Sequence, residues 1–275
     1  MGRRCTHLHT TVMLFITLMM PFAGTAFGAA AVFLLGRSMP RPLQRLLAGF
    51  AAGVMSAAAV WSLLLPAIGM SQSGNLPVWL PAAAGFAGGV LFLLLLDNTI
   101  PHLHIGASRS EGPAAMAAGL SPTAKLAFAV TLHNIPEGMA VGAVLAAAFS
   151  TGTAITMTAA MALSFGIAVQ NIPEGAIVSL PLRRDGQWRV KAFVYGVLSG
   201  AVEPAAATVT LLLVDLLLPW LPWLLAFAAG AMFYVVVEEL IPDAQREPHS
   251  DIGTIGFALG FLLMMVLDTA FGQNN

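Results

Sequence analysis

Eight apolar runs, each long enough to cross a lipid bilayer as a helix, divide this sequence of 275 residues. A helix needs about 20 predominantly apolar residues to cross the hydrocarbon core of a membrane. We therefore predict an all-α polytopic membrane protein with a single transmembrane domain over residues 1–275. The predicted spans are residues 12–35, 46–68, 78–98, 124–148, 154–180, 192–216, 219–241 and 253–272.

The composition excludes several other classes of protein. Only 9% of the residues are charged, against about 25% in an ordinary soluble domain. The formal net charge of −1 indicates no basic surface for nucleic acid. The single cysteine, Cys5, excludes a disulfide framework and a cysteine-rich zinc module.

The distribution of Lys and Arg predicts the orientation of the chain. Arg3 and Arg4 lie at the N-terminus, and the other ten of the 12 basic residues lie in or beside the first, third, fifth and seventh loops. Loops rich in Lys and Arg stay in the cytoplasm. We therefore expect both termini to lie outside the cytoplasm, with a cytoplasmic His-containing loop at about 99–123.

The first apolar run has a second interpretation. Two arginines, an apolar core and small residues near Gly28 are also the features of a secretory signal peptide. We favour a true span, because the apolar run continues through "AVFLLG" to a basic loop, and the signal peptide stays the alternative.

Two short stretches place polar residues inside the predicted spans, "HNIPEGMAVG" (133–142) and "QNIPEGAIVS" (170–179). They put Glu137 and Glu174 within spans four and five, and Glu203 lies within span six. A carboxylate at the bilayer centre costs about 2.5–3.5 kcal/mol or more. With no Lys or Arg at a matching depth, we expect the compensating charge to be a bound cation.

The spacing of these residues favours a metal site. At about 100° per residue, His133, Asn134 and Glu137 share a sector of about 100° over about 6 Å of helix, and Gln170, Asn171 and Glu174 repeat the pattern. Imidazole with several carboxylates suits Zn²⁺, Fe²⁺, Mn²⁺ or Cd²⁺ better than Mg²⁺ or Ca²⁺.

Proline and glycine accompany both stretches. Pro136 and Pro173 each remove a backbone donor, so we expect broken helices that expose carbonyl groups to an ion site. Glycines four residues apart recur in five of the predicted spans, which indicates close helix packing. These pairs are Gly49/Gly53, Gly85/Gly89, Gly138/Gly142, Gly196/Gly200 and Gly256/Gly260.

These residues resemble the ZIP (Zrt-, Irt-like protein) family of divalent-metal transporters, and within it the bacterial GufA-like branch. "HNIPEG" and "QNIPEG" resemble its fourth-helix and fifth-helix motifs, and "SGAVEP" (199–204) its sixth. "FAAGVMSAAAVWSLLLPA" (50–67) and "FAAGAMFYVVVEELIPD" (227–243) are similar to its second and seventh helices.

The resemblance implies a 3+2+3 arrangement, in which helices 1–3 and 6–8 are inverted repeats around helices 4 and 5. It also implies a binuclear metal site. One metal would be bound by His133, Glu137, Gln170 and Glu174. The second would be bound by Asn134, Glu137, Asn171, Glu174 and Glu203, and Glu239 would complete or line the site.

The function that the resemblance implies is transport of divalent transition metals into the cytoplasm by alternating access through sliding helical bundles. Zinc is the leading cargo, and cadmium, iron and manganese are the others. Relatives often have Asp or His where Gln170 and Asn171 stand, which puts the need for the second metal in doubt.

Further polar residues are candidates for the ion path. Asp97, His102, His104 and Glu238 could relay the metal on the cytoplasmic side, and a plain solvated loop is the alternative for the two histidines. Asp215 or Asp268 could serve the outer mouth.

Two other function classes compete with transport of metal. An intramembrane metal-dependent hydrolase is the main alternative, although the HEXXH motif is absent and no nucleophile stands apart from the metal ligands. A proton-coupled carrier of an organic solute would want aromatic or cationic groups beside the two motifs. The expected partners are metal ions and the lipid bilayer, with no nucleic acid, and a homodimer is left open.

Overall fold

The computed structural model describes residues 2–35, 39–72, 76–99, 122–150, 153, 155–248 and 250–271. Within these residues every regular element is a helix, and eight helical stretches are long and apolar enough to cross a membrane. The all-α class and the eight spans are therefore confirmed. The spans are Thr10–Leu34, Arg41–Ser71, Trp79–Thr99, Val130–Phe149, Met157–Arg184, Arg189–Leu212, Val214–Ala244 and Ile252–Phe271.

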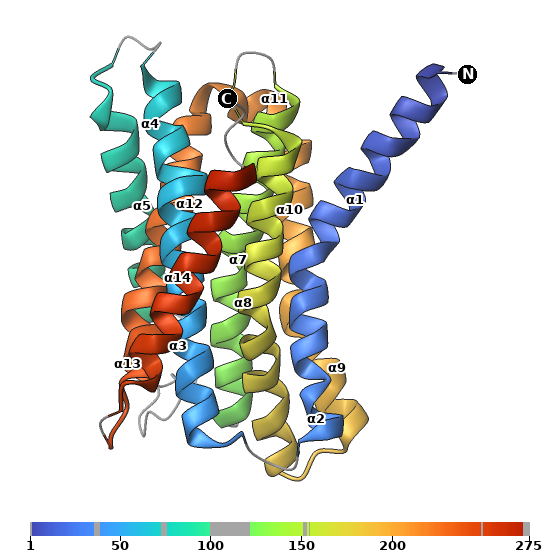
Figure 1. Cartoon of the computed structure of the whole chain (residues 1–275), viewed down its shortest axis with the longest axis vertical. Coiled ribbons are helices and arrows are strands. Elements are labelled where there is room, and N and C mark those ends of the chain that lie inside the picture. Colours follow the sequence, from blue (N-terminus) through green and yellow to red (C-terminus); the bar gives the residue numbers. More distant parts are fainter. Residues whose placement is uncertain are drawn as a thin grey trace.

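Several spans are built from more than one helical element (Figure 1). The first is α1 (Gly2–Ala29) with α2 (Ala31–Leu34), and the second is α3 (Arg41–Ala58), η1 (Ala59–Leu64) and α4 (Leu65–Ser71). Spans three to five are α5 (Trp79–Thr99), α7 (Pro122–Phe149) and α8 (Met157–Arg184). The sixth is α9 (Arg189–Gly200) with α10 (Val202–Leu212). The seventh is α11 (Val214–Leu217), η2 (Leu218–Trp220), α12 (Leu221–Val235), η3 (Val236–Leu240) and α13 (Ile241–Ala244), and the eighth is α14 (Ile252–Phe271).

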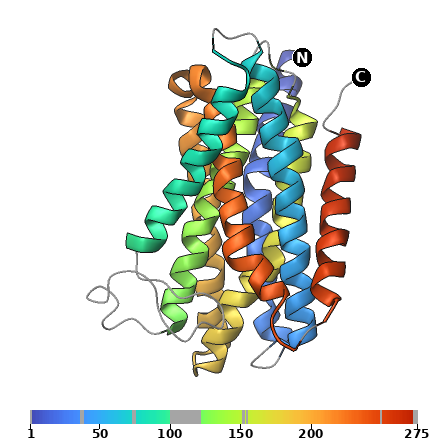
Figure 2. The ribbon, with the colours of Figure 1, turned by 90° about the vertical axis from the view of Figure 1, so that its left-hand side faces the viewer.

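The start of α1 and the end of α14 lie at the same end of the bundle (Figures 1 and 2). At the opposite end α3 begins with Arg41, α8 ends with Arg183 and Arg184, and α9 begins with Arg189. These four basic residues lie at the end of the bundle opposite to the start of α1 and the end of α14.

The spans associate in four close pairs, α1 with α8, α3 with α14, α5 with α12 and α7 with α10. Glycines bring the backbones of each pair together. A Cβ atom on Gly53 of α3 would overlap the Phe257 carbonyl of α14, and one on Gly89 of α5 would overlap the Phe227 carbonyl of α12. Backbone contact of this kind needs a residue without a side chain, so these glycines hold the pairs at their observed separation.

The pairing has the symmetry expected of inverted repeats. Span one pairs with span five, and span six pairs with span four. Span two pairs with span eight, and span seven pairs with span three. Exchanging spans 1–3 for spans 6–8, and span four for span five, leaves this pattern unchanged.

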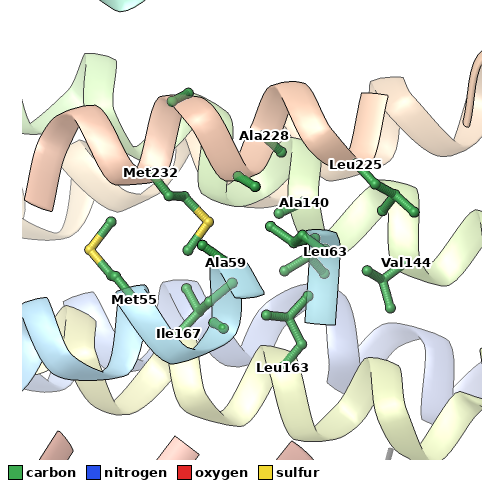
Figure 3. Packing of buried hydrophobic residues seen from close by; sticks show 14 of the residues in the cluster. Met55, Ala59, Leu63, Ala140, Val144, Leu163, Ile167, Leu225, Ala228 and Met232 are labelled. Carbon is green, nitrogen blue, oxygen red and sulfur yellow. The ribbon is translucent and has the colours of Figure 1, made fainter. Parts of the chain in front are cut away.

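An apolar core fills the space where the pairs meet (Figure 3). Met55, Ala59 and Leu63 of the second span, Ala228 and Met232 of α12, and side chains of α7 and α8 come together in this core. Leu163 and Ile167 of α8 are completely buried there. In lipid, such contacts stabilise the bundle by van der Waals packing rather than by exclusion of water.

The prediction of broken helices at Pro136 and Pro173 is wrong. Both prolines lie inside continuous helices, α7 and α8. In a membrane bundle, neighbouring helices and small local adjustments can satisfy the backbone groups that a proline frees.

The regular α-helix is interrupted in spans two and seven instead, by the π-helical segments η1 and η3. A π-helix has wider turns than an α-helix. Each is followed by a proline, Pro66 or Pro242. Because proline has no N–H group, the carbonyl four residues before it, that of Ser62 or Glu238, lacks its usual α-helical hydrogen bond. In both spans this carbonyl lies within the π-helical segment. Both stretches contain the letters "FAAG" followed by one residue and Met, which is a repeat that the sequence already displays.

Candidate metal centre

Polar side chains of three helices meet in the interior of the bundle. The helix α7 provides Asn134 and Glu137, α8 provides Gln170, Asn171 and Glu174, and α10 provides Glu203. Asn134, Gln170 and Asn171 are fully buried, Glu137 and Glu203 are 1% exposed, and Glu174 is 8% exposed. We call these six residues the polar centre.

All three amide side chains of the polar centre donate N–H groups to the protein, and Asn171 Nδ2 does so to the Pro21 carbonyl at 3.5 Å. Gln170 Nε2 donates to Glu137 Oε1 at 2.8 Å and also to Asn171 Oδ1. Asn134 Nδ2 donates to the Ser199 carbonyl at 3.2 Å and to Glu203 Oε1 at 3.1 Å. The Gln170 and Asn134 amides therefore each hold one carboxylate in place by a hydrogen bond, and their own oxygen atoms stay available for another partner.

Five buried oxygen atoms of the polar centre have no hydrogen-bond donor. They are Asn134 Oδ1, Glu137 Oε2, Gln170 Oε1, Glu174 Oε2 and Glu203 Oε2. A buried polar atom without a partner costs about 1–3 kcal/mol, and more when the group is charged. Three carboxylate and two amide oxygens that share this deficiency are the donor set that a cation would satisfy.

The three carboxylates also lie within electrostatic reach of one another. Glu174 faces Glu137 and Glu203 as well as Glu239 of η3, and Glu203 faces Glu137. Like charges in an environment of low dielectric repel strongly. A cation between them would turn this repulsion into attraction.

His133 and Glu239 connect the polar centre to the seventh span. His133 Nδ1 lies 3.2 Å from Glu239 Oε2, and His133 is 6% exposed. Among the residues described, no three His, Cys, Asp or Glu side chains are grouped closely enough to enclose an ion on their own. Amide oxygens of Asn134 and Gln170 would have to complete the coordination.

The first span contacts the polar centre, which the sequence analysis did not predict. Thr25 Oγ1 of α1 donates to Glu203 Oε1 at 3.0 Å. Ser164 of α8 donates to the Thr17 carbonyl, which Pro21 leaves without a backbone donor. The only sequence signal for these contacts is the presence of Thr17 and Thr25 in an apolar run.

The remaining candidates occupy different environments. Asp97 is 6% exposed and accepts a hydrogen bond from Tyr234 of α12, whereas Glu238 is exposed. Asp268 is buried and accepts from Ser62 Oγ at 2.5 Å, whereas Asp215 is exposed. His102 and His104, with the loop at 100–121, lie outside the described residues.

Comparison with known proteins identifies the family. A family model described as ZIP zinc transporter matches residues 107–268, which is more than half of the chain. The zinc transporter ZIP11 of Bos taurus is 38% identical, over 90% of this chain and 94% of the relative. The zinc transporter ZIPB of Bordetella bronchiseptica is 38% identical, over 91% of this chain and 79% of the relative.

A third relative comes from the predicted branch. The zinc transporter GufA of Myxococcus xanthus is 37% identical, over 91% of this chain and 96% of the relative. Nothing in these matches supports the hydrolase alternative. The chain belongs to the ZIP family of zinc transporters, which makes it a multi-pass membrane transporter of divalent metal cations and not an enzyme.

Proposed function

We propose that the protein carries zinc into the cytoplasm through the polar centre. The observation that carries this proposal is the set of five buried oxygens without donors, drawn from the residues that the two NIPEG motifs and "SGAVEP" supply. The three relatives are named as zinc transporters, which supports zinc as the cargo here. Cadmium, iron and manganese share its preference for mixed ligands of this kind.

The proposed first ion is held by His133, Glu137, Gln170 and Glu174. Because His133 Nδ1 faces Glu239, we assign Nε2 to the metal. Histidines that bind metals usually donate their other N–H group to a carboxylate or carbonyl. Gln170 Oε1 and Glu137 Oε2 are among the oxygens without donors, which supports their place in this set.

The proposed second ion shares Glu137 and Glu174 with the first and adds Asn134, Asn171 and Glu203. Asn134 Oδ1 and Glu203 Oε2 support it, because neither has a donor. Asn171 Oδ1 already accepts from Gln170, so an ion at this oxygen would share it with that hydrogen bond. We infer that the first ion binds more readily than the second.

The proposed direction of transport is inward, with both termini in the periplasm of a bacterial inner membrane. The end of the bundle that carries Arg41, Arg184 and Arg189 would face the cytoplasm by the positive-inside rule. A membrane potential that is negative inside favours inward movement of each elementary charge by about 2.3 kcal/mol per 100 mV, and a divalent ion gains about twice that.

We propose that alternating access arises from two groups of helices that slide past each other. The first group is α1, α7, α8, α9 and α10, and it contains the polar centre. The second is α3, α5, α12 and α14. Within the groups, glycines put backbones in contact, whereas apolar side chains such as Met232 and Ile167 meet between them. A boundary of apolar side chains has few directional contacts to break, which favours sliding.

The test is zinc uptake by proteoliposomes that contain the purified protein, with Zn²⁺, Cd²⁺, Mn²⁺ and Fe²⁺ compared side by side. We expect saturable zinc uptake by the unaltered protein and uptake at background level for Glu174→Ala. Glu247→Ala, which removes an exposed carboxylate, is the matched control and should transport normally. Uptake by Glu174→Ala equal to that of the unaltered protein would exclude the polar centre as the path.

A further inference from the structure

The first span contributes a hydroxyl group to the polar centre. Thr25 Oγ1 donates to Glu203 Oε1 at 3.0 Å, and Thr25 is completely buried. We propose that Thr25 is a positioning residue, which orients the Glu203 carboxylate so that its second oxygen faces the transported ion. This inference rests on the proposed function of the polar centre.

The direction of the Thr25 hydroxyl distinguishes it from other threonines in the spans. Thr131 and Thr210 donate to the carbonyl four residues back in their own helices, at 2.7 and 2.9 Å. The equivalent distance from Thr25 Oγ1 to the Pro21 carbonyl is 3.5 Å. A hydroxyl has one proton to donate, and the closer carboxylate of Glu203 is the stronger acceptor.

Two glycines hold Thr25 in this place. A Cβ atom on Gly200 would lie 2.7 Å from Thr25 Cβ and 2.8 Å from its Oγ1, and one on Gly175 would overlap the Thr25 carbonyl oxygen. Gly200 lies one turn before Glu203, and Gly175 directly follows Glu174. Thr25 is therefore packed against both spans that carry these carboxylates, with its side chain against Gly200 and its backbone against Gly175.

The hydrogen bonds on Glu203 fall on one oxygen only. Thr25 and Asn134 both donate to Oε1, whereas Oε2 is buried without a donor. Two donors on a single oxygen fix the rotation of the carboxylate and leave Oε2 for a cation. Without Thr25 the carboxylate would keep only the Asn134 contact and would lose this fixed orientation.

In the inverted-repeat symmetry of the bundle, Thr25 of the first repeat occupies the position that Glu203 occupies in the second. A Cβ atom on Gly138, which follows Glu137, would overlap the Glu203 carbonyl, just as one on Gly175 would overlap the Thr25 carbonyl. Thr25 is thus related to α8 as Glu203 is related to α7. One repeat supplies a carboxylate at this position and the other supplies the hydroxyl that orients it.

The experiment compares Thr25→Val, which keeps the shape and loses the hydroxyl, with Thr25→Ser, which keeps the hydroxyl. For Thr25→Val we expect the zinc Kd of the purified protein and the KM of uptake in proteoliposomes to rise by about tenfold, the size of a lost hydrogen bond to a charged group, with Vmax within about twofold. Thr25→Ser should restore both constants to within about twofold. Thr210→Val, which removes a buried hydroxyl bonded to its own helix, should leave them unchanged.

A cycle with Glu203→Ala tests whether Thr25 acts through Glu203. In that background Thr25→Val should change the zinc Kd by less than about twofold, because the interaction is already absent. The proposal would be overturned if the effects of Thr25→Val and Glu203→Ala on the zinc Kd were fully additive. It would also be overturned if Thr25→Ser weakened zinc binding as much as Thr25→Val, or if Thr25→Val bound zinc as tightly as the unaltered protein.

Two further outcomes keep the test decisive. If Thr25→Val is not monodisperse on size exclusion, Thr25→Ser and Thr25→Ala form the replacement pair, and equal zinc affinity in that pair would overturn the proposal. If the unaltered protein neither binds nor transports zinc, the proposed function itself fails, which is a different result from normal uptake with no effect of Thr25→Val.

Discussion

At the scale of single residues, nitrogen and oxygen atoms of the amides in the polar centre have different environments. The amide nitrogens of Asn134 and Gln170 point at carboxylate or carbonyl oxygens of the protein, and their oxygens are left without donors. In the proposed metal site, these neutral amides would contribute oxygen ligands without adding negative charge. The three carboxylates of the polar centre would then supply the attraction for a divalent ion.

Asn171→Asp tests this balance of charge. The new carboxylate would stand beside Glu137 and Glu203, so we expect a zinc Kd about tenfold lower, corresponding to about 1.4 kcal/mol, and a lower Vmax because release is slower. Titration of the purified protein and initial rates of uptake measure the two effects. Asn98→Asp, at an exposed position of α5, is the control, and an unchanged Kd in Asn171→Asp would mean that the second ion site is idle.

At the scale of helices, the contacts that set the separation of paired spans are made by backbones rather than by side chains. Gly85 and Gly89 of α5 lie against the backbone around Trp223 and Phe227 of α12, and Gly230 of α12 lies against the Phe86 carbonyl. Glycines contribute from both members of the pair. A single added methyl group at such a position has nowhere to go unless the two helices move apart.

Gly89→Ala and Gly88→Ala form a matched pair for this argument. The Cβ of Gly89→Ala would overlap the Phe227 carbonyl, whereas that of Gly88→Ala meets only Phe227 Cδ2 at 3.7 Å, an ordinary contact. We expect Gly89→Ala to destabilise the protein by about 1–3 kcal/mol and Gly88→Ala to leave stability unchanged. Thermal denaturation followed by size exclusion measures both, and equal midpoints would show that the backbone contact is dispensable.

The helices also show which features of the fold could be predicted. The number of spans could be predicted from the length of the apolar runs, because bilayer thickness sets a minimum of about 20 residues. The residues of the two NIPEG motifs could be predicted as a site, because burying a charge in a membrane is costly. The wide turns η1 and η3 did not follow, because Pro66 and Pro242 look like Pro136 and Pro173 in sequence. Only neighbouring helices decide which proline disturbs its span. Thr25 was missed for a related reason, since its partner Glu203 is 178 residues away.

At the scale of the whole molecule, polar contacts tie each group of helices internally. Thr25, Asn134 and Glu203 are joined within the group that contains the polar centre. Ser62 with Asp268, and Tyr234 with Asp97, are joined within the second group. The contact of His133 with Glu239 crosses the boundary, so sliding of the groups would have to break it. Apart from this contact and the approach of Glu174 to Glu239, apolar side chains such as Met232 and Ile167 form the boundary between the two groups.

Cross-links test whether these groups move during transport. Gly166 of α8 lies against Met264 of α14, across the boundary, and Gly88 lies against Phe227 within the second group, where an added Cβ would be 3.7 Å from Phe227 Cδ2. In a Cys5→Ser background, which removes the one native cysteine, we expect the oxidised pair Gly166→Cys/Met264→Cys to lose zinc uptake and to regain it on reduction. The oxidised pair Gly88→Cys/Phe227→Cys should transport zinc at the rate of its own reduced form, because its disulfide joins helices that travel together. Uptake that survives a complete cross-link between α8 and α14 would contradict sliding of the two groups, since a covalent bond at the boundary permits no displacement of one against the other.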